Sequence, residues 1–210
     1  MILRATFENI YSFKDETSVS FVAGKGSVHP AHVSRAQKRD DISALKFGII
    51  YGANASGKSN VIKAIALLQQ IALGRFPIGD FEPFKLVKPI KPVSKIEIEF
   101  KTDGRYFAYG VEFSANGIRE EWLYEINARS DKKIFTRKTD SDGNQFEFGD
   151  IHGDNSVGQF VKFLGEGTPA KRSFLAEYIE RNGKGLCPIK VAYQWFATGL
   201  RIIFPGTRFR

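Results

Sequence analysis

The sequence predicts an α/β fold in which a strand–loop–helix unit is followed by an antiparallel β meander. Three observations support this fold class. A glycine-rich loop at 52–59 lies between an apolar run and a helical stripe, short alternating segments fill residues 95–148, and a helical period returns after residue 155. We expect a single domain, 1–210, organised as strands, loop and helix (1–75), meander (95–148), then helical segments with a final strand (155–210).

The first 23 residues are expected to form two strands around a turn. Leu3, Ala5 and Phe7 alternate with polar residues, and the same alternation returns at 19–23 after Asp15-Glu16. Glycines, a proline and a run of charges in residues 24–45 predict a loop or a short helix.

The segment Gly52-Ala-Asn-Ala-Ser-Gly-Lys-Ser59 is a complete G-x-x-x-x-G-K-[ST] phosphate-binding loop. The motif is meaningful only between a strand and a helix, and both are predicted here. The apolar run Phe47–Tyr51 predicts a strand buried on both faces. Apolar residues at three- and four-residue spacing from Val61 to Ala72 predict a helix that ends near Gly74. The sequence therefore predicts a nucleotide site.

The residue types of this loop suit ATP and Mg²⁺. Backbone N–H groups and the positive end of the helix dipole favour phosphates, and glycines at 52 and 57 let the backbone approach closely. We expect Lys58 to act catalytically on the β- and γ-phosphates and the Ser59 hydroxyl to ligate Mg²⁺. The predicted nucleotide-binding residues are Gly52, Ala53, Asn54, Ala55, Ser56, Gly57, Lys58, Ser59 and Asn60.

The meander is predicted by Asx-Gly pairs at 103–104, 116–117 and 142–143, which are strong hairpin signals between alternating segments. The acids at 120–121 and 140–142 fall in or beside these turns, where solvated charge is expected. Beyond the meander, the period predicts helices over Gln159–Leu164, Ser173–Arg181 and Ile189–Phe196, and a strand over Leu200–Phe204.

Composition limits the remaining functions. The net charge of +8 is spread evenly, and Cys187 is the only cysteine, so a reducing, cytoplasmic compartment is the simpler interpretation. No apolar run reaches membrane-spanning length. His29 and His32 lack further metal ligands at suitable spacing. The basic residues Lys85, Lys88, Lys91 and Lys95 leave contact with DNA or RNA open, although a solvated loop is the commoner meaning.

The opening Asn9-Ile-Tyr-Ser-Phe-Lys-Asp15 is similar to the N-F-[KR]-S-[FH]-x-[DE] opening of ABC-type ATPase heads in SMC and RecF-like proteins. The segment 52–60 matches their G-x-N-x-S-G-K-[ST]-N loop. The chain most resembles the amino-terminal half of bacterial AAA15 or AAA_21 (OLD-like) ATPases, which also carry a His-Pro segment, here His29-Pro30. The resemblance implies a P-loop NTPase of the ABC-ATPase head type, in which two subunits sandwich ATP. Relatives often act in phage defence or toxin-like systems, sometimes beside a TOPRIM-type nuclease partner.

Two departures from the family pattern shape the expected function. Tyr11 stands where relatives often carry a basic residue, so a phosphate contact from this turn must come from backbone or Ser12. No apolar run followed by Asp-Glu, the Walker B element, is present, and Ser156-Val-Gly-Gln159 only mimics part of a signature motif.

We therefore expect a chain that is incomplete at its carboxy end and inactive alone as an ATPase. It would act through self-association or through a chain that supplies the Walker B and signature motifs. A non-hydrolysing regulatory module, and a nucleic-acid-binding module with a vestigial loop, remain alternatives.

Overall fold

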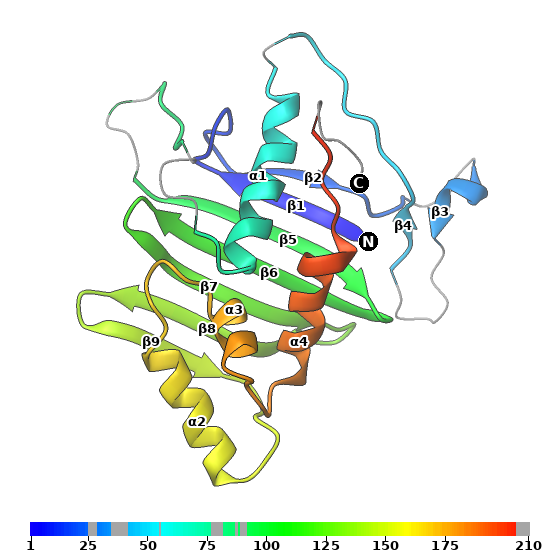
Figure 1. Cartoon of the computed structure of the whole chain (residues 1–210). Coiled ribbons are helices and arrows are strands. Elements are labelled where there is room, and N and C mark those ends of the chain that lie inside the picture. Colours follow the sequence, from blue (N-terminus) through cyan, green and yellow to red (C-terminus); the bar gives the residue numbers. More distant parts are fainter. Residues whose placement is uncertain are drawn as a thin grey trace.

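A seven-stranded antiparallel sheet organises the computed structural model (Figure 1), which describes residues 1–24, 29–34, 42–54, 56–76, 82–86, 88 and 92–204. The strand order is β2-β1-β5-β6-β7-β8-β9. The strands span Ile2–Glu8 (β1), Thr17–Ser20 (β2), Ser94–Thr102 (β5), Arg105–Ser114 (β6), Gly117–Ile126 (β7), Lys132–Asp140 (β8) and Gly143–Phe148 (β9). A separate pair consists of β3 (Val33–Ser34) and β4 (Ala44–Leu45).

The predicted meander is confirmed as β5 to β9, and its tight turns lie at the Asx-Gly pairs. Asp103 and Gly104 have φ values of 49° and 71°. Positive φ at both central residues is the backbone of a type I′ hairpin turn, which matches the twist of the flanking strands. The register of β5 with β6 is accordingly unbroken, from Ser94 opposite Phe113 to Thr102 opposite Arg105.

The two amino-terminal strands are also confirmed, and they extend the same sheet. β1 pairs with β2 on one side and with β5 on the other, so that Ala5 lies opposite Ile98. Leu3, Ala5 and Phe7 are buried on the core face of β1. The turn between β1 and β2 is thereby fixed at an end of the sheet close to the start of β5.

Helices cover one face of this sheet (Figure 1). They span Lys58–Ala72 (α1), Asn155–Glu166 (α2), Phe174–Glu180 (α3) and Cys187–Gln194 (α4), with a short 3₁₀ turn at Pro30–His32 and a π-helical turn at Trp195–Gly199. All four expected helices are confirmed. Within the described ranges, no helix has both the length and the apolarity needed to cross a membrane.

Two expected strands are wrong. Phe47–Tyr51 and Leu200–Phe204 belong to no strand, and the side chain of Ile49 is 79% exposed rather than buried. The later segment runs beside α1 (Figure 1), where the Gln69 amide donates to the carbonyls of Phe196 and Leu200. High β-propensity alone does not make a strand, because a strand also needs a hydrogen-bonding neighbour.

The expectation of solvated charge at 120–121 is wrong for Glu121, which is fully buried with Arg137. The Glu121 carboxylate accepts hydrogen bonds from the amides of Phe174 and Leu175, and so caps α3. The Ser173 hydroxyl, which is the N-cap of α3, donates to the carbonyl of Ala72 at the end of α1. This chain of contacts joins the meander to the helix that follows the phosphate-binding loop.

Candidate nucleotide-binding site

The site begins at the hairpin tip between β1 and β2. Ile10 and Phe13 exchange both backbone hydrogen bonds, which leaves Tyr11 and Ser12 at the tip. The Asn9 side-chain amide donates to the Val93 carbonyl at 2.6 Å, which ties this turn to the start of β5. Tyr11 itself has a φ of 50°, an uncommon conformation for a bulky residue. The tip is therefore held in one orientation.

Ser12 meets the phosphate-binding loop directly. The Asn60 side-chain amide donates to the Ser12 hydroxyl at 3.1 Å. Gly57, the N-cap of α1, has a φ of 88°, and a Cβ atom there would collide with the Ser12 oxygen. Glycine is thus required at position 57 both for its left-handed backbone and for this close approach. The structure brings Ser12, which the family resemblance suggested, next to the predicted loop.

Lys58 folds back across the loop from the first position of α1. Its ammonium group donates to the carbonyls of Gly52 and Ala53 at 2.7 and 2.6 Å. These carbonyls hold the Lys58 ammonium at the start of the loop, where a bound phosphate would compete with them for it. Ala55 lies outside the described residues, and Asn54 is exposed at the loop tip.

The start of α1 offers donors to an anion. Within the described residues, the amides of Gly57, Lys58 and Ser59 donate to no acceptor, as expected for the first turn of a helix. No acid lies in this first turn, so the positive end of the helix dipole is not neutralised locally. Ser59, the second residue of α1, is exposed, and its hydroxyl is an oxygen of the kind that Mg²⁺ prefers as a ligand. The residues present therefore fit ATP and Mg²⁺.

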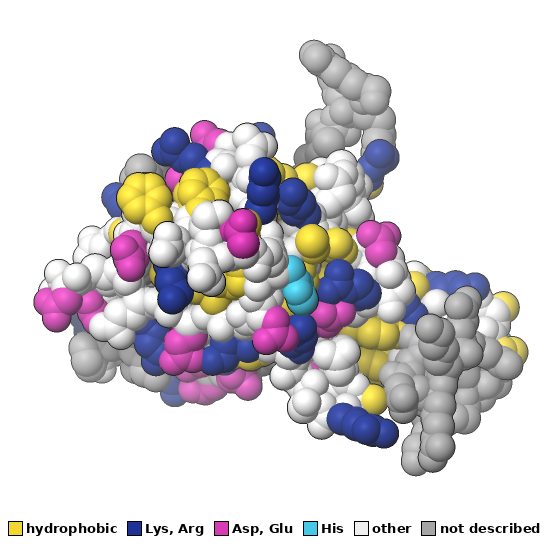
Figure 2. Space-filling view, turned by 90° about the horizontal axis from the view of Figure 1, so that it is seen from below, with side chains coloured by type: hydrophobic (Ala, Val, Ile, Leu, Met, Phe, Trp, Pro, Cys, Tyr) yellow, Lys and Arg dark blue, Asp and Glu magenta, His cyan; other side chains and the backbone are white. Residues whose placement is uncertain are grey.

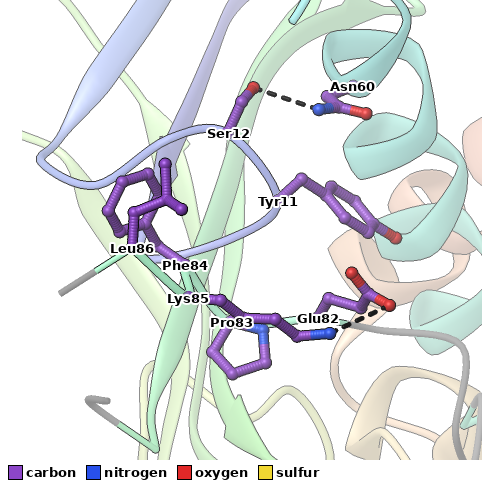
Figure 3. A pocket seen from close by; sticks show the side chains of 8 residues that line it. All are labelled: Tyr11, Ser12, Asn60, Glu82, Pro83, Phe84, Lys85 and Leu86. Atoms are coloured by element: carbon purple, nitrogen blue, oxygen red, sulfur yellow. Dashed lines mark hydrogen bonds and ion pairs between the residues drawn. The ribbon is translucent and has the colours of Figure 1, made fainter. Parts of the chain in front are cut away.

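A pocket of about 360 Å³ adjoins the first turn of α1 (Figure 3). Its lining residues are Tyr11, Ser12, Asn60, Glu82, Pro83, Phe84, Lys85 and Leu86. Sequence reasoning found Ser12 and Asn60 but missed the wall formed by 82–86. That wall carries no motif. A hydrogen bond of 2.7 Å from the Tyr11 amide to the Glu82 carbonyl joins it to the hairpin tip.

The signature-like segment 156–159 does not offer a second phosphate site. It forms the first turn of α2, but the Asp154 carboxylate already accepts hydrogen bonds from the amides of Ser156 and Val157. This carboxylate occupies the anion position of the helix terminus with its own negative charge.

The basic loop is largely neutralised where the structure describes it. Lys85 pairs with Glu82 and Lys95 with Glu16, whereas Lys88 is exposed and Lys91 lies outside the described residues. On the face shown in Figure 2, basic and acidic side chains are interspersed.

His29 and His32 stack edge to face, 5.8 Å apart. No group of three metal-ligating side chains occurs among the described residues.

Comparison with known proteins identifies a family for this chain. No curated protein matches the chain. The sequence model of the AAA_21 family, described as "AAA domain, putative AbiEii toxin, Type IV TA system", matches residues 47–175. The match includes the phosphate-binding loop, α1 and the meander, and it covers more than half of the chain. The chain therefore belongs to the AAA_21 family of AAA-type ATPase domains.

Proposed function

We propose that the chain binds ATP with Mg²⁺ at residues 52–60 and acts as the nucleotide-binding part of an AAA_21 ATPase. The observation that carries this proposal is the geometry of the loop. The Lys58 ammonium contacts the carbonyls of Gly52 and Ala53, and the first-turn amides of α1 donate to no acceptor among the described residues. Amides, helix dipole and lysine together favour the triphosphate of a nucleotide.

Thermal unfolding with and without Mg-ATP tests this binding. If the ligand concentration is 100 times Kd, mass action adds about 2.7 kcal/mol to the free energy of unfolding. Lys58→Ala should abolish this stabilisation. Lys63→Ala is the matched control, because Lys63 is exposed on α1 one turn further along. An unchanged wild-type melting curve with nucleotide would contradict the proposal.

We further propose that the segment 47–51 adds to a sheet supplied by another polypeptide. Its backbone groups make no hydrogen bond within the described residues, and Tyr51 is 90% exposed. Phe47, Ile49 and Ile50 are also exposed, so the segment leading into the loop presents an extended apolar edge. Such edges template strand addition. The partner is a second copy of this chain or a chain that carries the Walker B and signature motifs.

Light scattering at micromolar concentration tests the partner surface. We expect a dimer or larger species, and Ile49→Asp should shift it toward the monomer. Phe163→Asp is the matched control, because Phe163 is 70% exposed on α2. Strand addition would be refuted if the wild type is monomeric and also forms no complex with a chain that carries the Walker B motif.

Hydrolysis is proposed to occur only in such an assembly. The loop can hold and charge-stabilise the phosphates, but phosphoryl transfer also requires a group that orients the attacking water. The description of the family names a toxin of a toxin–antitoxin system, and we propose that the chain acts in such a system or in phage defence.

A further inference from the structure

We propose that the pocket between Tyr11 and residues 82–86 receives the base and ribose of the nucleoside triphosphate. This inference rests on the proposed binding of the phosphates at 52–60. It assigns recognition of the nucleoside to the wall 82–86, which carries no sequence motif, and to Tyr11, which stands where related ATPase heads often have a basic residue.

The direction of the bound triphosphate places its nucleoside at this pocket. Lys58 reaches the β- and γ-phosphates in such loops, and its ammonium lies at Gly52 and Ala53. The γ-phosphate end is therefore on the side of the loop where Gly52 and Ala53 lie. The opposite, α-phosphate end points along the first turn of α1, where Asn60 lies. Asn60 and Ser12 are hydrogen bonded to each other and both line the pocket.

The walls of the pocket suit a flat heteroaromatic ring. Tyr11, Pro83 and Phe84 provide apolar and aromatic surface, whereas Glu82 and Lys85 provide an acceptor and donors from one ion pair of 3.1 Å. In Figure 3 the Tyr11 ring extends toward α1, between Asn60 and the Glu82 carboxylate. A few polar groups within a mostly apolar cleft are typical of small-molecule sites. Purine edges offer both donors and acceptors to such a pair.

Leu86 adds exposed apolar surface to the pocket wall. Its side chain is 87% exposed although it belongs to the pocket wall. A bound base would remove part of this apolar surface from water, which is favourable.

The pocket is also preorganised on the Tyr11 side. The amide of Tyr11 donates to the Glu82 carbonyl, and the Ser94 hydroxyl donates to the Asn9 carbonyl. The backbone that carries Tyr11 is thus held in place without a ligand, which lowers the conformational entropy lost on binding.

Comparing ATP with tripolyphosphate separates the pocket from the loop. Both ligands carry the triphosphate, but only ATP carries a base and ribose. By calorimetry with Mg²⁺, we expect the wild type to bind ATP more tightly than tripolyphosphate. Tyr11→Ala should weaken ATP about tenfold, in the range seen when an aromatic stacking partner of a base is removed. It should leave tripolyphosphate affinity within about twofold. Tyr124→Ala, on β7, is the matched control and should change neither affinity.

Leu86→Ser provides a second variant, because an exposed side chain can be replaced without affecting the fold. It should also lower the affinity for ATP selectively. Equal affinity of the wild type for ATP and tripolyphosphate would overturn the pocket assignment while leaving the proposed loop function intact. Equal losses for both ligands in Tyr11→Ala and no selective loss in Leu86→Ser would overturn it too. If neither ligand binds the wild type, the proposed function fails together with this inference.

Discussion

Replacing Arg137 with methionine should destabilise the protein far more than replacing a surface arginine. The Arg137 guanidinium lies 3.6 Å from the Glu121 carboxylate, and both side chains are fully buried. It also donates to the carbonyls of Arg172, Thr168 and Pro169. Arg137→Met would leave a buried carboxylate without its cation and three carbonyls without this donor. Breaking a buried pair from one side costs about 3–5 kcal/mol.

Urea unfolding followed by tryptophan fluorescence measures this cost. Trp195 is a suitable probe, because it is buried and its ring stacks on Phe100 at 4.0 Å. With a slope of about 2 kcal/mol per molar urea, the midpoint should fall by about 2 M. Arg105→Met is the control, since Arg105 pairs with Glu125 near the surface at 2.7 Å and should lose at most about 1 kcal/mol. Equal midpoint shifts for the two variants would refute the reasoning.

The cost of Arg137→Met should also depend on pH. Burial raises the pKa of the Glu121 carboxyl, and Arg137 acts in the opposite direction. Removing Arg137 therefore raises the folded-state pKa further. A group with a raised folded-state pKa stabilises most below its unfolded-state pKa, about 4.3 for glutamate, and this contribution is lost as pH rises through the folded-state pKa. The loss of unfolding free energy in Arg137→Met relative to the wild type should thus be smaller at about pH 4 than at pH 7. An equal loss at both pH values would show that Glu121 does not take up a proton.

Three further outcomes are expected. Gly110→Ala should lower the free energy of unfolding by about 1–3 kcal/mol, because the new Cβ would collide with the Trp122 ring. Gly158→Ala on α2, where the space is open, should raise it by up to about 1 kcal/mol. Urea midpoints that move in the same direction for both variants would contradict this. Asp154→Ala should cost about 0.5–2 kcal/mol through the lost N-cap of α2, and an unchanged midpoint would show that the cap is dispensable. ATP turnover by the chain alone should stay at background in a phosphate-release assay, and turnover that disappears in Lys58→Ala would reveal an overlooked catalytic acid.

The features predicted correctly from the sequence are those that a few consecutive residues encode. The phosphate-binding loop, helix α1 and the turn at Asp103-Gly104 depend on a motif, a helical period and a positive φ, each contained in a few consecutive residues. The amino-terminal strands and the later helices were predicted for the same reason.

Tertiary structure decided what depends on a neighbour distant in the chain. Phe47–Tyr51 has the composition of a buried strand but makes no ladder within the described residues, because a strand forms only beside a partner. Because Glu121 lies near a turn in the sequence, its carboxylate is expected in solvent, yet β8 and the start of α3 enclose it. Tyr11 and the 82–86 wall meet only because β1 pairs with β5, which brings residue 9 to Val93. No local sequence pattern predicts these contacts, because they join residues that are distant in the chain and meet only through packing and hydrogen bonding in the folded sheet.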